Sequence, residues 1–281
     1  MLRAGNRMTV PACLAASLLA ILGCGSSGTS GDVPTESPTR TDSHSVASPE
    51  LDDHERVPQR SPSEAARGQA GTIETLRSGG WAVETNGREE AVVATWESGA
   101  VGPEAAQHLA ALDTLERVTL WMCPDADDLL LDRLSGLKRL TSLTVRGGRV
   151  SDACVESLSR MTALESLNLG DTRGFTGAGL EKLMRSKGLK RVVLDGTGVT
   201  DAVVSSWPRE SGLEMVNLNR TQIGAGAVAS LKKMTTLRSV FVVDVTLPGD
   251  VAAAWRRDRP NCLLFDGKQE PSPTRSRPTS R

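Results

Sequence analysis

One pattern recurs six times between residues 115 and 242, and it limits what the chain can fold into. Each copy places apolar side chains at its first, fourth and sixth positions, as in Leu140-Thr-Ser-Leu143-Thr-Val145. The last apolar position falls at residues 120, 145, 169, 194, 218 and 242, a step of 24 or 25. Such a period is typical of a solenoid, because stacked coils bury the apolar face that a single coil leaves open. Trp96 and Phe265 fit as degenerate copies at the two ends.

Each copy predicts a strand, a turn and a short helix. The alternation of apolar residues indicates a strand with one buried face. Small or hydroxyl-bearing residues such as Thr172, Thr197 and Thr221 follow three residues later and suit a stacked turn. The segment Asp152–Leu158 then has helical spacing, and Ser151, Thr176 and Thr200 are expected to be helix N-caps. The chain has no Tyr and only 3 Phe, so we expect a core of Leu, Val and Ala.

The repeat, with a helix start of the form Val199-Thr200-Asp201-Ala202, resembles the leucine-rich repeat family. It is most similar to the variety with 24-residue repeats and a Thr or Cys after the strand. The resemblance covers roughly residues 90–266 and implies an α/β solenoid, with a parallel sheet on the concave side and short helices on the convex side. It also implies protein binding on the concave face. The sequence departs from the pattern at Trp207, Trp255 and Pro124-Asp125.

The N-terminus has the form of an export signal. Arg3 and Arg7 precede an apolar run from Met8 to Gly23, which has the length of a signal-peptide core. The run ends in Ile21-Leu22-Gly23-Cys24, which resembles a bacterial lipobox, a motif found in many bacterial lipoproteins. It implies lipid attachment at Cys24 and a location in the cell envelope, facing the periplasm or the exterior. The alternative is a plain signal peptide, or an uncleaved anchor, with an incidental cysteine.

The composition divides the remainder of the chain. Residues 24–70 are rich in Ser, Thr, Pro and Gly and predict a disordered tether after the signal peptide at residues 1–23. Residues 71–90 predict an N-terminal cap, with a short helix near Ile73–Leu76 and a hairpin whose Asn86-Gly87 indicates a type I′ turn. Residues 91–266 form the repeat domain, and residues 267–281 are expected to be a disordered basic tail.

The concave face supplies the candidate binding site. Strand positions between the buried residues, and those just after each strand, carry polar side chains with one Trp and scattered Arg, residue types that are enriched at binding hot spots. The candidates are Trp121, Arg146, Asn168, Asp171, Asp195, Asn217, Asn219 and Arg220. The sequence does not identify the protein partner, and we expect a monomer.

Other function classes receive less support. The 33 Lys and Arg against 34 Asp and Glu argue against a dedicated nucleic-acid or acidic-membrane binder. His108 is the single histidine of the repeat region, Cys123 occupies a core position, and no motif indicates a catalytic residue, a metal or a cofactor. Asp125, Asp127, Asp128 and Asp132 offer oxygen ligands for Ca²⁺ but are expected to surround a helix start. We therefore expect a non-enzymatic binding module; the alternatives are an envelope-decorating protein without a discrete ligand and a calcium-dependent adhesin.

Overall fold

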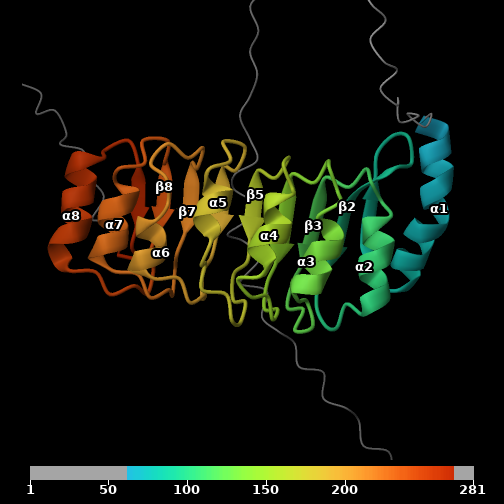
Figure 1. Cartoon of the computed structure of the whole chain (residues 1–281), viewed down its shortest axis with the longest axis horizontal. Coiled ribbons are helices and arrows are strands. Elements are labelled where there is room, and N and C mark those ends of the chain that lie inside the picture. The colour runs from blue at the N-terminus through green and yellow to red at the C-terminus, as the bar shows by residue number, and fades with distance from the viewer. Residues whose placement is uncertain (1–61, 269–281) are drawn as a thin grey trace, which may run out of the picture. The chain divides into compact units, whose positions relative to one another are not determined.

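The computed structural model describes residues 62–268, which form a stack of coils with helices on one face of a single sheet (Figure 1). The helices are α1 Pro62–Ser78, α2 Pro103–Ala110, α3 Asp128–Leu134, α4 Cys154–Ser159, α5 Leu180–Met184, α6 Asp201–Ser205, α7 Ala225–Leu231 and α8 Gly249–Asp258. The strands are β1 Ala82–Thr85, β2 Ala91–Trp96, β3 Arg117–Leu120, β4 Ser142–Val145, β5 Ser166–Asn168, β6 Arg191–Val193, β7 Met215–Asn217, β8 Ser239–Phe241 and β9 Leu263–Phe265.

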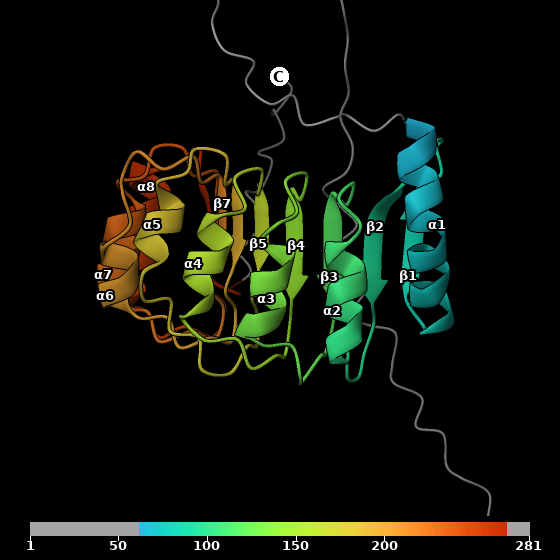
Figure 2. The same ribbon diagram turned by 45° about the vertical axis from the view of Figure 1, so that its right-hand side comes forward.

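The sheet confirms the predicted leucine-rich repeat solenoid. Its strands lie side by side in chain order from β1 to β9, and every neighbouring pair from β2 onward is parallel. Leu167 pairs with Leu143 on one side and with Val192 on the other, so the repeat positions form one ladder. The side chains of this ladder are fully buried between the sheet and the helices. The opposite face, which Figure 2 shows free of helices, is called the open face below and is the face predicted to be concave.

Threonine hydroxyls stabilise the turn that follows each of three strands. Thr172, Thr197 and Thr221 each donate to the carbonyl oxygen three residues earlier, at 2.6 to 2.7 Å. Cys123 occupies the equivalent place, where its thiol contacts the Trp121 carbonyl at 3.1 Å. The small or hydroxyl-bearing residue in the repeat therefore donates to a backbone carbonyl at the end of its strand.

The N-terminal cap is larger than the sequence predicts. Helix α1 begins at Pro62, so the predicted tether is wrong for residues 62–70. Gln69 anchors this added part: its side-chain oxygen accepts from the Ala91 amide and the Thr114 hydroxyl, both at 3.1 Å. Its side-chain nitrogen donates to Asp113. The helix was missed because the segment before Ile73 buries a polar side chain instead of an apolar one.

The predicted hairpin between β1 and β2 is present, but its turn is not of type I′. The loop spans residues 86–90, and Glu89 adopts the left-handed conformation (φ 62°) while Gly87 does not. The Asn86 side chain accepts from the amides of Arg88 and Glu90 and so closes a longer loop. Asn-Gly was therefore a correct signal for a hairpin and a wrong one for the turn type.

Two of the three predicted helix caps also differ. Thr200 is the N-cap of α6, whereas α4 and α5 begin after Ala153 and Gly179 instead of at Ser151 and Thr176. Ser151 and Thr176 bond to a carboxylate of the preceding coil, Asp128 and Asp152 respectively. These residues therefore link adjacent coils.

The signal peptide with Cys24, the tether up to residue 61 and the tail from residue 269 lie outside the described residues. Within residues 62–268, none of the helices combines the length and the apolar character needed to cross a membrane.

Candidate functional site on the open sheet face

The sheet places the predicted binding residues in two rows at the exits of the strands. The first row includes Trp121, Arg146, Gly170, Asp195 and Asn219, one residue per coil, each directly after the last apolar position of its repeat. The residues that follow form the second row, which includes Asp171 and Arg220. Because adjacent strands lie about 4.8 Å apart, a long side chain in one coil reaches the next two coils.

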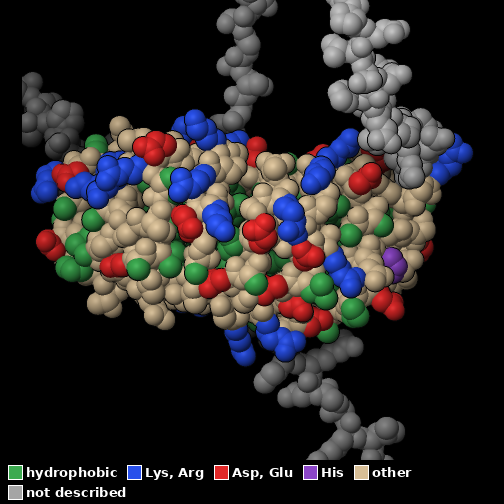
Figure 3. All heavy atoms as spheres, viewed as in Figure 1, with side chains coloured by type: hydrophobic (Ala, Val, Ile, Leu, Met, Phe, Trp, Pro, Cys, Tyr) green, Lys and Arg blue, Asp and Glu red, His purple; other side chains and the backbone are tan. Residues whose placement is uncertain are grey.

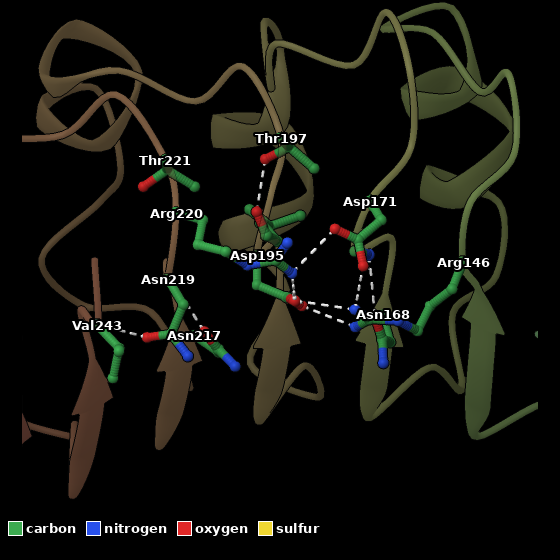
Figure 4. A network of polar contacts seen from close by, with 12 residues as sticks. Arg146, Asn168, Asp171, Asp195, Thr197, Asn217, Asn219, Arg220, Thr221 and Val243 are labelled. Atoms are coloured by element: carbon green, nitrogen blue, oxygen red, sulfur yellow. Dashed lines mark hydrogen bonds and ion pairs between the residues drawn. The ribbon is translucent and has the colours of Figure 1, made fainter. Parts of the chain in front are cut away.

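Four of the predicted residues form one ion-pair network (Figure 4). Arg146 makes a two-pronged contact with Asp195, with Nη1–Oδ1 at 2.7 Å and Nη2–Oδ2 at 2.9 Å, and it also pairs with Asp171. Arg220 Nη2 contacts Asp171 Oδ1 at 2.9 Å and Asp195 Oδ2 at 2.8 Å. Two cations and two anions thus neutralise each other across four coils. The sequence indicated each residue as exposed and polar but not that they bind one another.

Two glycines leave the space that this network occupies. A Cβ atom on Gly170 would lie 2.4 Å from both Arg146 Nη1 and Asp195 Oδ1. A Cβ atom on Gly196 would lie 2.3 Å from Asp171 Oδ1. Arg146 therefore reaches Asp195 across the Gly170 coil, and Arg220 reaches Asp171 across the Gly196 coil.

The network fixes the charge state of Arg146 and Asp195. Burial raises the pKa of Asp195, but hydrogen bonds and charge from Arg146 and then Arg220 outweigh burial, so its pKa lies below the ordinary value. Burial lowers the pKa of Arg146, yet its contacts with Asp195 and Asp171 raise it overall. The Arg146 and Asp195 side chains are only 14% and 10% exposed. The pair is thus a charged, largely dehydrated part of the open face.

The second row has a repeated backbone conformation. Seven successive coils place a left-handed residue here, with φ between 49° and 77°. These residues are Met122, Gly147, Asp171, Gly196, Arg220, Asp244 and Gly267. Left-handed backbone costs a non-glycine residue roughly 1 kcal/mol or more, so the strand-exit turn imposes this conformation even on Arg220 and Met122.

The predicted asparagines support the backbone of these turns. Asn168 and Asn217 each accept through Oδ1 from the amide two residues later, at 2.9 and 3.0 Å. Asn219 Oδ1 accepts from the Val243 amide of the next coil at 2.7 Å. Trp121 lies beside the network, with the Arg146 guanidinium 5.2 Å from its ring centroid. The structure therefore brings all eight predicted residues to one face, and several of them have internal partners.

Apolar side chains on and beside this face were missed as binding candidates. Met122 is 65% exposed next to Trp121, and Leu263 and Phe265 on the edge strand β9 are 56% and 44% exposed. Phe265 packs edge-on against Phe241 of β8, with ring centroids 6.0 Å apart. The sequence placed Phe265 in the last degenerate repeat, but alternation around the buried Leu264 was a signal that its neighbours face solvent.

The acidic cluster near α3 has protein partners. Asp125 accepts from the amides of Val101 and Gly102, and Asp127 caps α3 by accepting from Leu130. Asp128 holds Ser151, as described above, and Asp132 pairs with Arg160. Among residues 62–268, no group of three or more His, Cys, Asp or Glu side chains is arranged to hold a metal ion. The cluster therefore links coils and caps a helix.

The cysteines of the repeat domain are poor nucleophiles. Cys123, Cys154 and Cys262 are buried free thiols. Burial, followed by nearby carboxylates, raises the pKa of Cys123 and of Cys154 to about 12. Burial also raises the pKa of Cys262. Since the thiolate is the reactive form, these groups are chemically quiet near neutral pH.

Comparison with known proteins adds solved structures of low similarity. No protein-family model and no curated protein sequence matches the chain. An internalin from Listeria monocytogenes is 17% identical, with a TM-score of 0.46, over 70% of this chain and 61% of its own length. A leucine-rich repeat protein from Leptospira interrogans is 13% identical, with a TM-score of 0.41, over 56% of this chain and 38% of its own.

A chain from the Toll–Spatzle complex of Drosophila is 16% identical, with a TM-score of 0.40, over 52% of this chain and 20% of its own. This chain thus spans less than two thirds of the length of each of these structures. The assignment of the solenoid rests on the register of its own strands and on the buried ladder that they share.

Proposed function

We propose that the chain is an exported, lipid-anchored and non-enzymatic module that binds a protein through the open face of its solenoid. The observation that supports binding most directly is the juxtaposition of ordered charges and exposed apolar side chains on one face. The Arg146–Asp195 network orders its side chains before a partner arrives, which lowers the entropy cost of association. Trp121 and Met122 lie at one end of the network, and Phe241 and Phe265 lie beyond the other.

The apolar side chains are the expected source of affinity. Large exposed side chains on an otherwise polar surface mark binding sites, and a partner gains free energy by covering them. The Arg and Asp side chains already neutralise each other, so they are expected to define orientation and specificity more than to supply binding energy. The partner is therefore expected to present an apolar patch bordered by polar groups.

The lipid anchor is a separate part of the proposal and rests on the sequence Ile21-Leu22-Gly23-Cys24. Labelling of cells with a radioactive fatty acid tests it. The full chain is expected to take up label, and Cys24→Ala is expected to lose it. Equal labelling of both chains, or of neither, would contradict attachment at Cys24.

A matched pair of substitutions tests the open face. Leu263 and Leu129 are both 56% exposed, but Leu263 lies on β9 of the sheet and Leu129 on helix α3. Leu263→Ser is expected to reduce recovery of the partner from envelope extracts at least tenfold. Leu129→Ser is expected to leave recovery unchanged. An equal loss in both variants, or in neither, would reject the open face as the binding surface.

A further inference from the structure

The two long edges of the solenoid carry opposite charge, although the chain as a whole has a formal charge of -1. At the first edge the helices end and the strands begin; we call it the basic edge. In the six coils from α3 to α8 it comprises residues 132–142, 156–166, 181–191, 206–215, 232–239 and 256–263. These segments hold 16 Lys and Arg and 7 Asp and Glu.

The second edge, at which the strands end and the helices begin, is the opposite edge. In the same coils it comprises residues 121–128, 146–153, 170–179, 195–201, 219–224 and 243–250. These segments hold 4 Lys and Arg and 9 Asp and Glu. In the space-filling view, Lys and Arg side chains gather along the upper border of the helix-bearing face, above α5 to α8 (Figure 3).

The segments of the basic edge form a continuous row because consecutive turns contact one another. The Thr236 hydroxyl donates to the Ser211 carbonyl, and Arg160 donates to the Ser135 hydroxyl. Gly212 lies so near the Lys187 carbonyl that a Cβ atom there would be 2.2 Å from its oxygen. Five coil steps of about 4.8 Å give the row a length of roughly 24 Å. Adjacent coils thus lie within a Debye length of about 8–10 Å, so their potentials add.

Many of these cations make no ion pair that is recorded among the residues the structure describes. Eight exposed Lys and Arg in these segments make no ion pair recorded within residues 62–268: Lys138, Arg139, Lys182, Arg185, Lys187, Arg191, Arg209 and Lys233. Helix dipoles favour cations in the last helical turn. They do not account for Lys138, Arg139 and Lys187, which lie beyond the ends of α3 and α5.

The chain that precedes the solenoid enters at this same edge. Gln69, in the first half of α1, bonds to Asp113 and Thr114 in the turn between α2 and β3. Pro62 therefore lies on the side of the basic edge, and the predicted lipid-bearing Cys24 is 38 residues earlier in the sequence. The row thus holds exposed cations without a recorded ion pair among residues 62–268, next to the point at which the preceding chain enters. Such a row is complementary to a bilayer surface that carries anionic lipids.

We propose that the basic edge docks on the headgroups of anionic phospholipids, so that the open sheet face stands upright and free for its partner. This inference rests on the envelope location proposed above, because it needs a membrane within reach. It does not need the lipid at Cys24. Binding of the edge is electrostatic and is expected to weaken as salt rises.

The test compares vesicles of phosphatidylcholine with vesicles that also contain phosphatidylglycerol, using the full chain. The readout is the ratio of the two binding constants, because an apolar leader or an acyl chain contributes to both. Wild type is expected to favour the anionic vesicles at least tenfold at physiological salt and to lose this preference at 1 M salt, where the Debye length is about 3 Å. A ratio near one for wild type at physiological salt would overturn the proposal.

Two double variants with the same charge change locate the surface. Arg185→Glu with Lys187→Glu, on the basic edge, is expected to reduce the ratio at least fivefold. Arg149→Glu with Arg173→Glu, exposed on the opposite edge, is expected to leave it within twofold. If the double variant on the basic edge does not fold, Lys187→Gln is a milder second variant. Its ratio of vesicle-binding constants is expected to be intermediate. Equal losses at both edges, or tighter binding to a short DNA duplex than to anionic vesicles, would reject the docking surface.

The fatty-acid label at Cys24 separates this inference from the anchor. A wild-type ratio of vesicle-binding constants that favours anionic vesicles, without fatty-acid label at Cys24, would reject the anchor and support docking by the basic edge. Fatty-acid label at Cys24 together with a vesicle-binding ratio of one would support the anchor and reject docking by the basic edge.

Discussion

At the residue scale, the open face depends on the missing side chains of two glycines as much as on its charged side chains. Gly170 and Gly196 lie beneath the ion pairs. Gly170 belongs to the first row of strand-exit residues and Gly196 to the second, and neither adds a side chain there. Arg146 and Asp195 can therefore meet across an intervening coil while the strands keep their spacing. The network is a property of four successive coils and not of any single repeat.

Gly170→Ala tests this arrangement. The added methyl group would displace Arg146 and Asp195, and the expected cost is about 1–3 kcal/mol of unfolding free energy, as for other insertions into packed sites. Urea titration measures it. Gly136→Ala is the control, because a Cβ atom there meets nothing within 4 Å, and it is expected to change stability by less than about 0.5 kcal/mol. Equal effects of the two substitutions would contradict the packing described.

Asp195→Asn tests the electrostatics through pH. The pKa of Asp195 is lower in the folded chain than the unfolded value of about 3.9, so its stabilising contribution is complete above that value and is lost as pH falls through the folded pKa. The variant is expected to lose about 2 kcal/mol at pH 7, since a charged hydrogen bond to Arg146 is removed. The difference in unfolding free energy between wild type and variant should shrink below pH 4.

Thermal or urea unfolding over pH 2.5 to 7 measures this gap. Asp244→Asn, an exposed left-handed position with no recorded ion pair among the described residues, is the control and is expected to show no such trend. A constant gap across the whole pH range would contradict the assigned charge state of Asp195.

The sequence predicted which of these residues share a face but not their contacts. The period of 24 or 25 residues fixes the coil position of Arg146, Asp171, Asp195 and Arg220, and strand alternation fixes their side of the sheet. Their pairing depends on side-chain rotamers and on the gaps above Gly170 and Gly196. These features require coordinates for neighbouring coils, which a linear pattern does not supply.

At the element scale, four coils are stabilised by a polar side-chain contact at the turn as well as by the apolar ladder. Thr197 shows this, because its buried hydroxyl satisfies the Leu194 carbonyl at 2.6 Å. The sequence indicated the small or hydroxyl-bearing position but placed α1 and the β1–β2 turn incorrectly. Both errors arose where a polar side chain, Gln69 or Asn86, supplies the backbone contacts that apolar periodicity does not reveal.

Thr197→Val isolates the turn contact, since valine has nearly the same shape and no hydroxyl. The loss leaves the Leu194 carbonyl without this donor, and the expected destabilisation is about 1–3 kcal/mol in urea unfolding. Thr235→Val is the exposed control and is expected to stay within about 0.5 kcal/mol. A neutral Thr197→Val would show that the hydroxyl ladder is dispensable.

At the scale of the whole molecule, the parallel stack turns a repeated sequence into faces and edges with distinct chemistry. Lys or Arg follows the helix in all six coils from α3 to α8, and Asp precedes it in five of them, so charges that nearly cancel in the composition separate toward the two edges. The net charge of the chain argued against a binder of acidic membranes. Only the placement of the charges on the fold suggests an edge that docks on anionic lipids. The open face lies between these edges and carries the exposed aromatic side chains.

The most direct test of the account is photocrosslinking in intact cells from single positions on each face. A photoreactive residue at Asn217 or Phe241, on the open face, is expected to form a specific adduct with another protein. The same residue at Leu129 or Ala229, on the helix-bearing face, is expected to form none. Adducts of equal yield from both faces, or none from the open face, would contradict the claim that this sheet surface binds the partner.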